Sequence, residues 1–267
     1  MVNGNVNIHE DKGKVSDVKG KPFNTQAIKD KFEKQLKEKE KEFINESLLL
    51  AVKSNSLDEV KFYIEKGADI NFQDGEGRTA LMLSVLDGHK EIFDFLIEKG
   101  ADVNIKEDYG TTALMWSVIY GHTEIFKILI EKGADVNIKS DDGENALYWS
   151  ATHGYIEISK ILIENKADLN VQDYEGMTAL MRAVKKGHIE ISKLLIENGA
   201  DLNVYNKEYK FDLLSLVVRE TALIIAVEKG HTEIVDLLIE KGAKVPLFYI
   251  FDVGLKRYLK QFSVKKN

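Results

Sequence analysis

The sequence predicts an all-α protein, a solenoid of stacked helix pairs with hairpin loops that project from the stack. Two observations predict this fold: apolar residues recur at helical spacing, and the same short motifs return every 33 residues. Thr79, Thr112 and Thr178 share this register, with Asn145 in the remaining position. A Gly-His pair follows at Gly88-His89, Gly121-His122 and Gly187-His188, and again at Gly230-His231 after an insertion.

Each unit is predicted to contain two short helices. Thr79 caps the first helix, whose apolar side carries Leu81 and Val85. Gly88 ends this helix because glycine readily adopts a positive φ. The second helix has four apolar residues at helical spacing, Ile92, Phe93, Leu96 and Ile97. Neither helix can bury its apolar face alone, so each unit must stack on its neighbours.

Six such units are expected between residues 46 and 246. The first, about 46–71, is divergent, with Asn55-Ser56 at the Gly-His position. The sixth ends near Pro246 and is also divergent. The four regular units between them are 74–106, 107–139, 140–172 and 173–205.

The motifs resemble those of the ankyrin-repeat family, whose pattern runs D-x-x-G-x-T-P-L-H-x-A, then G-H-x-E-I-V, then G-A-D-V-N. Residues 100–104 and 133–137 both read Gly-Ala-Asp-Val-Asn, and 199–203 differ from them only at Leu202. The resemblance implies an ankyrin-repeat solenoid whose hairpin tips and inner helices line a concave binding face.

Some positions depart from the family pattern. Alanine stands where the family has proline, and the following histidine is replaced by Met82, Met115, Tyr148, Met181 or Ile224. We therefore expect the hydrogen bonds of that histidine to be absent and the helix starts to rely on packing. Lys166 replaces the glycine that closes its unit, and a left-handed conformation there costs about 1 kcal/mol.

Both ends of the chain lie outside the repeats. Residues 1–24 are polar and aperiodic, which predicts disorder. The Lys/Glu-rich segment 25–45 carries a narrow apolar stripe and is expected to form a helix that caps the first repeat; a partner-binding or coiled-coil helix is the alternative. Residues 247–267 are expected to form a C-terminal cap and a basic tail, or to contact an acidic surface.

An insertion at 206–220 interrupts the register before the sixth unit. It adds ten residues, several of them apolar, to a hairpin that has five in regular units. Such a segment must fold back on the repeats or meet a partner, and we favour folding back because an exposed apolar strand promotes aggregation.

The charge distribution favours a protein partner over nucleic acid. The chain carries −7 in total, but residues 1–42 carry +2 and residues 254–267 carry +5, which leaves −14 on residues 43–253. A segment with this much negative charge would repel the phosphate backbone of nucleic acid. The charge instead favours a partner protein with a basic surface.

We expect no catalytic, cofactor or metal site. The absence of cysteine excludes Cys-ligated zinc and thiol nucleophiles. Residues 75–80 fit G-x-G-x-x-A, but no strand precedes them. The H-x-E segments at the Gly-His turns lack the cysteine pair of zinc deaminases, and successive histidines should lie roughly 10 Å apart, too far to share a metal.

The sequence also predicts a soluble, cytoplasmic protein. No apolar run approaches the roughly 18 residues that a membrane-spanning helix needs, and the N-terminus lacks the apolar core of a secretory signal. A chain that had lost a leader before residue 1, or a secreted effector, would show the same sequence.

The predicted partner-binding face centres on Trp116 and Trp149, which occupy the same position in adjacent units and should stack in register. Aromatic side chains within a polar rim are typical of binding hot spots. The alternative is that both tryptophans only fill space between inner helices. The residues expected to contact a partner are Glu76, Arg78, Asp108, Tyr109, Trp116, Tyr120, Asp141, Asp142, Glu144, Tyr148, Trp149, His153, Tyr174 and Arg182.

These observations together predict a monomeric protein-interaction module, acting as a scaffold, adaptor or inhibitor. A structural spacer, or a solenoid that self-associates through its Lys/Glu helix, is the alternative.

Overall fold

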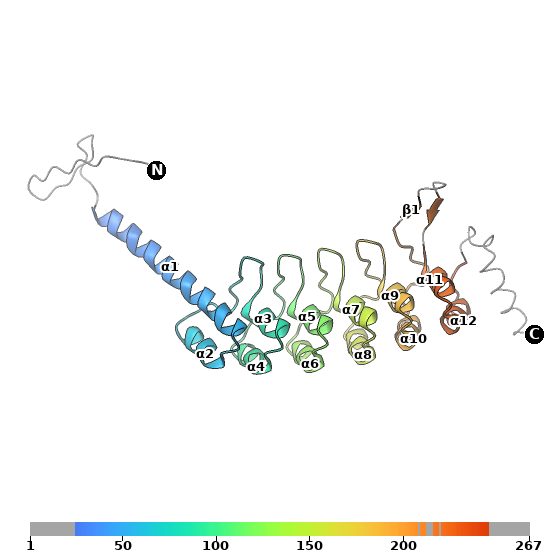
Figure 1. The fold of residues 1–267 in the computed structure, drawn as a ribbon, viewed down its shortest axis with the longest axis horizontal. Helices are drawn as coiled ribbons and strands as arrows, with labels where there is room; N and C mark the ends of the chain where they lie inside the picture. Colours follow the sequence, from blue (N-terminus) through green and yellow to red (C-terminus); the bar gives the residue numbers. More distant parts are fainter. Residues whose placement is uncertain (1–24, 208, 212–215, 219, 246–267) are drawn as a thin grey trace, which may run out of the picture.

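The computed structural model describes residues 25–207, 209–211, 216–218 and 220–245, where twelve α-helices form one elongated stack (Figure 1). The segments expected to be disordered (1–24) and to cap the C-terminus (247–267) lie outside the described residues. The helices are α1 Thr25–Lys53, α2 Leu57–Glu65, α3 Ala80–Leu86, α4 Lys90–Glu98, α5 Ala113–Ile119, α6 Thr123–Glu131, α7 Ala146–His153, α8 Ile156–Glu164, α9 Ala179–Lys186, α10 Ile189–Glu197, α11 Ala222–Lys229 and α12 Thr232–Glu240.

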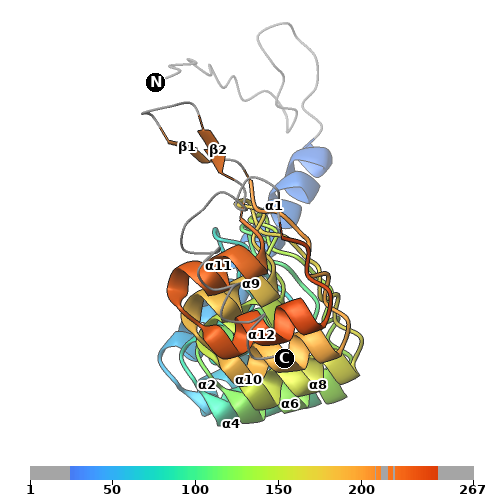
Figure 2. The same ribbon diagram turned by 90° about the vertical axis from the view of Figure 1, so that its right-hand side faces the viewer.

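Consecutive helices pair from α1–α2 to α11–α12, and the pairs stack in chain order. The end view in Figure 2 separates an outer row, α2 to α12, from an inner row that lies nearer the loops. The core runs between the rows, where each helix buries its apolar side, as with Leu81 and Val85 on α3 and Phe93 on α4. The predicted solenoid of helix pairs is confirmed.

Side-chain caps begin the inner helices of the second to sixth pairs. The Thr79 hydroxyl accepts a hydrogen bond from the Met82 N–H, and Thr112, Asn145, Thr178 and Thr221 cap α5, α7, α9 and α11 in the same way. The helix starts therefore do not rely on packing alone, because each cap satisfies a backbone donor that the helix leaves free. Lys166 adopts the expected left-handed conformation, with φ of 66°.

A ladder of asparagines joins successive units. Asn71 Oδ1 accepts a hydrogen bond from the Asp102 N–H at 2.9 Å, and Asn104 Oδ1 accepts one from the Asp135 N–H at 2.8 Å. The contact recurs at Asn137, Asn170 and Asn203. It explains why asparagine closes the Gly-Ala-Asp-Val/Leu-Asn motif, and it holds neighbouring hairpins in a fixed register.

The hairpin tips also touch directly. The Asp108 N–H donates to the Glu76 carbonyl at 3.1 Å, and the Asp141 N–H donates to the Tyr109 carbonyl at 2.9 Å. Gly77 permits this approach, because a Cβ atom there would lie 2.7 Å from the Asp108 nitrogen. The projecting loops therefore form one connected edge along the stack, visible above the inner helices in Figure 1.

Helix α1 differs from the predicted capping helix. It does not end near residue 45 but runs without a break to Lys53, so the first helix of the first repeat is its C-terminal part. Residues 26–43 are exposed, and α1 points away from the stack in Figure 1. The stripe at Ile28, Phe32 and Leu36 covers nothing in the repeats, so the expected capping role is wrong.

The insertion forms an antiparallel pair of short strands, β1 Tyr209–Phe211 and β2 Leu216–Val218, with Tyr209 opposite Val218. Asn206 and Glu220 close its base through backbone and side-chain hydrogen bonds. Both views show the strands standing clear of the helices, so the expectation that they fold back is not met (Figures 1 and 2). The strands instead satisfy each other's backbone groups.

Candidate functional site

Two aromatic rows lie on neighbouring repeats near the middle of the stack. Trp116 on α5 stacks on Tyr120 with ring centroids 5.7 Å apart, and Tyr120 stacks on His122 at 6.1 Å. The row runs from the inner helix to the turn before α6. Trp116 is half-buried and Tyr120 is 48% exposed, so the row is open to solvent along its Tyr120 end.

The second row repeats this arrangement one unit later. Trp149 on α7 stacks on His153 at 5.9 Å, and His153 stacks on Tyr155 at 5.6 Å. Burial and the nearby Lys186 and His188 lower the pKa of His153 and favour its neutral form. Other repeats carry aliphatic or charged residues at the tryptophan position, namely Leu83, Arg182 and Ile225.

The predicted aromatic patch needs two corrections. Within the described residues, Trp116 and Trp149 make no ring contact with each other, because each stacks along its own helix. Tyr148 is only 2% exposed and packs edge-on against Trp149, so it lies in the core and is not a contact residue. Tyr109 and Tyr174 stand apart at hairpin tips, 75% and 60% exposed.

The loops that precede α5 and α7, residues 106–111 and 139–144, are called here the middle hairpins. They carry five carboxylates: Glu107, Asp108, Asp141, Asp142 and Glu144. Asp108, Asp141 and Asp142 are exposed, whereas Glu107 is buried and accepts hydrogen bonds from the N–H groups of Tyr109 and Thr111.

No ion pair joins any of these five carboxylates to a basic side chain in the described part of the chain. Lys106 and Lys139 belong to the same hairpins but do not pair with them. The carboxylates of the middle hairpins therefore form no ion pair among the described residues, although Arg182 of a later repeat acts electrostatically on Glu144.

Glu144 is the carboxylate most affected by this setting. Burial, together with the negative charges of Asp142 and Asp173, raises its pKa to about 7. Arg182 and Ser140 act in the opposite direction but do not outweigh them. Glu144 therefore changes charge near neutral pH, and a cation placed beside it would favour the ionised form.

The flanking hairpins, residues 73–78 and 172–177, are neutralised by arginine. In the first, Arg78 binds Asp74 at 2.9 Å and Glu76 at 2.7 Å. Burial opposes the ionisation of Asp74, but hydrogen bonds from the Arg78 side chain and backbone lower its pKa overall. Both predicted contact residues, Glu76 and Arg78, are thus engaged with each other.

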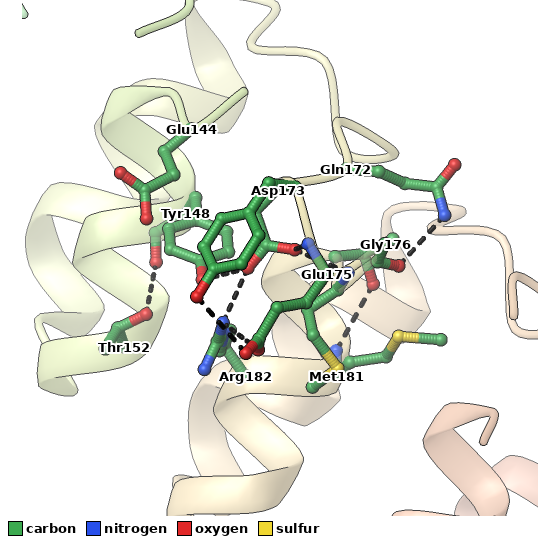
Figure 3. Close-up of polar contacts among 12 residues, drawn as sticks. Glu144, Tyr148, Thr152, Gln172, Asp173, Glu175, Gly176, Met181 and Arg182 are labelled. Atoms are coloured by element: carbon green, nitrogen blue, oxygen red, sulfur yellow. Dashed lines mark hydrogen bonds and ion pairs between the residues drawn. The ribbon is translucent and has the colours of Figure 1, made fainter. Parts of the chain in front are cut away.

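The second flanking hairpin contains a denser network, drawn in Figure 3. Arg182 on α9 binds Asp173 at 2.5 Å and Glu175 at 2.9 Å, and its guanidinium lies 5.3 Å from the centre of the Tyr148 ring. The Tyr148 hydroxyl donates to Asp173 across the repeat boundary. Tyr148 stands at the position of the missing family histidine and makes this hydrogen bond to the next repeat through its own hydroxyl.

Charge balance inside this network is set by Asp173, whose side chain is fully buried. Burial opposes its ionisation, but hydrogen bonds from Arg182, Tyr148 and the Met177 N–H outweigh that effect and lower its pKa. Burial and the hydrogen bond to Asp173 raise the pKa of Tyr148. The network therefore holds an ionised Asp173 and Arg182 together in the interior.

Asp173 was not among the expected contact residues, although the 33-residue period contains a signal for it. The equivalent positions are Asp74, Glu107, Ser140, Asp173 and Asn206, each a side-chain acceptor. In every case the side-chain oxygen accepts a backbone N–H of its own hairpin. A polar residue returning at this period indicates a structural hairpin residue.

The described residues contain no group of three His, Asp or Glu side chains placed to hold a metal ion. None of the described helices has the length and apolarity needed to cross a bilayer.

Comparison with known families agrees with the geometry. Residues 48–140 and 133–206 match the family model described as ankyrin repeats in three copies, and residues 219–247 match the model for an ankyrin repeat. The first two matches together span 48–206, more than half of the chain. No curated protein matches the sequence.

Proposed function

This chain belongs to the ankyrin-repeat family, and from that premise we propose that it is a scaffold, adaptor or inhibitor that captures a basic protein surface on its third and fourth repeats. Ankyrin repeats are in general protein–protein interaction modules. The observation that carries the more specific proposal is that the carboxylates of the middle hairpins form no ion pair with the described basic residues.

The charge pattern selects the partner's chemistry. Arginine neutralises both flanking hairpins internally, whereas the carboxylates between them, Asp108, Asp141, Asp142 and Glu144, have no ion-pair partner in the described chain. A basic side chain brought by another protein completes the missing pairs. The same negative charge disfavours nucleic acid, since phosphates would be repelled.

The aromatic rows supply the contact area. They occupy the same two repeats as the unpaired acids, and their rings are partly open to solvent at Trp116, Tyr120, Trp149 and His153. Rigid aromatic side chains bury much area with little loss of conformational entropy. A partner that places apolar and basic groups side by side therefore meets both halves of this surface.

Arg182 shows how a guanidinium fits such a setting. It lies over an aromatic ring, Tyr148, while pairing with two carboxylates of the adjacent hairpin. One repeat earlier, Trp149 occupies the position equivalent to Arg182 and Asp142 the position equivalent to Glu175. We infer that a partner's arginine stacks on Trp149 and pairs with Asp142 and Glu144.

We propose a cytoplasmic, non-catalytic role. Ankyrin-repeat proteins are typically non-enzymatic binding scaffolds, which supports this proposal.

The test begins with the full chain immobilised to capture proteins from lysate of the source organism. The captured protein is then purified and its Kd measured against wild type and the triple variant Asp141→Asn/Asp142→Asn/Glu144→Gln. We expect the triple variant to bind roughly 30-fold more weakly, because close charge pairs are lost without changing the shape of the face. Wild type should bind more tightly at low salt, and the triple variant should lose this salt dependence.

A matched triple variant on the outer helices, Glu124→Gln/Glu131→Gln/Glu157→Gln, removes the same charge from exposed positions away from the hairpins. It should bind within about twofold of wild type, as expected for distant exposed charges. Equal losses in both triple variants would mean that only net charge matters, and unchanged binding in the hairpin variant would place the site elsewhere.

A further inference from the structure

Helix α1 carries an exposed apolar stripe that the binding face does not use. The stripe consists of Ile28, Phe32, Leu36, Phe43 and Leu50, which are 41% to 68% exposed. At about 100° per residue, all five side chains fall within an arc of roughly 80° around the helix axis. They therefore form one continuous line, about 33 Å long at 1.5 Å per residue.

The stripe runs into a groove at the first hairpin. Leu50, its last member, lines this groove together with Leu49, Phe72 and Gly75. The rest of the lining is polar or charged: Glu42, Glu46, Lys53, Gln73 and Asp74. Because the groove is continuous with the stripe, a helix lying along α1 would also contact the first repeat.

An unaccompanied helix of this kind has little to stabilise it. Residues 26–43 are exposed, whereas helices in proteins gain most of their stability from packing an apolar face against a neighbour. The contacts within it are weak and exposed, such as the Lys34–Glu38 pair at 3.8 Å. Covering the stripe would remove five large apolar side chains from water.

We propose that two copies of this chain pair through α1 in antiparallel orientation. The sequence predicts a monomer, with self-association through this helix as the alternative, and the exposed stripe favours the alternative. The pairing is independent of the proposed partner-binding face, since it uses the opposite end of the described stack from α12 and none of the middle hairpins.

Charge selects the orientation. A parallel, in-register pair would place Lys39 on the Lys39 of the second copy and Glu46 on its Glu46, all within the stripe. In the antiparallel register that sets Phe32 opposite Phe43, Lys29 lies opposite Glu46 and Leu36 lies beside the aliphatic stem of Lys39. Each favourable contact then occurs twice, as two-fold symmetry requires.

The antiparallel arrangement also suits the shape of the molecule. Helix α1 leaves one end of the stack and points away from it (Figure 1). Two such helices side by side would hold the stacks at opposite ends of the pair, with both middle-hairpin faces free. The dimer would therefore present two copies of the binding face, which raises avidity for a multivalent partner.

Sedimentation equilibrium of the full chain tests the proposal. We expect a dimer of twice the 30.2 kDa chain mass at micromolar concentrations, and a monomer for Phe32→Lys/Phe43→Lys. Both phenylalanines are about two-thirds exposed, so the variant should keep the wild-type circular dichroism spectrum. A wild-type chain that stays monomeric up to about 200 µM, well above the range of typical specific dimers, would overturn the proposal.

Charge reversal tests the orientation. Lys29→Glu and Glu46→Lys should each weaken dimerisation roughly tenfold, because two symmetric attractions become repulsions. The double variant Lys29→Glu/Glu46→Lys should restore it, whereas Lys34→Glu, on the far side of α1, should have no effect. A double variant as weak as the singles would overturn the antiparallel register. Partner affinity of the monomeric variant, measured one-to-one, should stay at the wild-type value, which separates this test from that of the binding face.

Discussion

The middle and flanking hairpins occupy equivalent positions in the repeat but treat negative charge in opposite ways. In the flanking hairpins Arg78 and Arg182 bind the carboxylates, and at Asp173 the pair is buried. In the middle hairpins no arginine is present, and the acids at the tips are exposed. One repeat scaffold therefore uses charge for cohesion at some positions and leaves it available for contacts at others.

Sequence position decides which use applies. Position 182 carries arginine where the two preceding repeats carry Trp149 and Trp116. The same exchange that removes the internal cation introduces the aromatic ring. The third and fourth repeats therefore combine unpaired acids with an aromatic surface, which is the combination expected of a binding face. The second repeat has Leu83 at this position and pairs its acids through Arg78 instead.

The largest expected effect is the loss of the flanking network. Arg182→Leu should lower the free energy of unfolding by about 3 kcal/mol at pH 7, because it leaves Asp173 charged and buried without its partner. Urea denaturation followed by circular dichroism measures this loss. Since the pKa of Asp173 is lowered in the folded state, the pair's contribution is present above the usual aspartate pKa and falls as acid protonates the carboxylate.

Two further variants compare the contribution of charged residues to stability in the flanking and middle hairpins. Arg78→Leu should cost about 1–2 kcal/mol, since Asp74 is partly exposed and water replaces part of the pairing. Asp142→Asn in a middle hairpin should change stability by less than about 0.5 kcal/mol. If Asp142→Asn were as costly as Arg182→Leu, the distinction between the two kinds of hairpin would not hold.

The next effect concerns the aromatic rows. Trp116→Leu/Trp149→Leu should weaken partner binding by about 2 kcal/mol, roughly 30-fold, while the fold is kept. Leucine is chosen because Leu83 fills the same position in the second repeat, so packing between inner helices is conserved. Isothermal titration calorimetry with the captured partner gives the affinity.

Tyr205→Ala, an exposed aromatic outside the rows, is the matched control and should bind like wild type. Full affinity in the leucine variant would support the alternative that the tryptophans only fill space.

The last effect is a pH-dependent gain in stability. Because the pKa of Glu144 is raised to about 7 in the fold, the folded state binds more protons than the unfolded chain between the two pKa values. Stability therefore falls as pH rises through this range. Glu144→Gln removes that loss and should stabilise the protein by about 1–2 kcal/mol at pH 8, allowing for solvent screening.

At pH 5 the gain in unfolding temperature should be much smaller, since Glu144 is then protonated in the folded chain and only partly ionised in the unfolded chain. Thermal unfolding at the two pH values measures the difference. An equal gain in unfolding temperature at both pH values would show that the effect of the substitution is not electrostatic.

Sequence alone determined the repeat, because periodic caps, glycines and apolar faces are local signals that each unit carries in full. It also placed the acids and tryptophans of the third and fourth repeats in one region, since a fixed period brings equivalent positions side by side. Contacts across repeat boundaries were not predictable in this way. Tyr148 was expected on the surface, but the structure places it in the core, where it contacts Asp173 and Arg182 of the next repeat.

Tertiary structure also determined whether the apolar stripe of α1 contacts the repeats or faces water. Its stripe was visible in the sequence, but an apolar stripe is the same whether it covers a repeat or faces water. What distinguishes these cases is the direction in which the helix leaves the stack. That direction follows from how its last turns, with Leu48 and Val52 buried, pack on α2 and α3. Periodicity specifies which residues share a face, and packing specifies what that face meets.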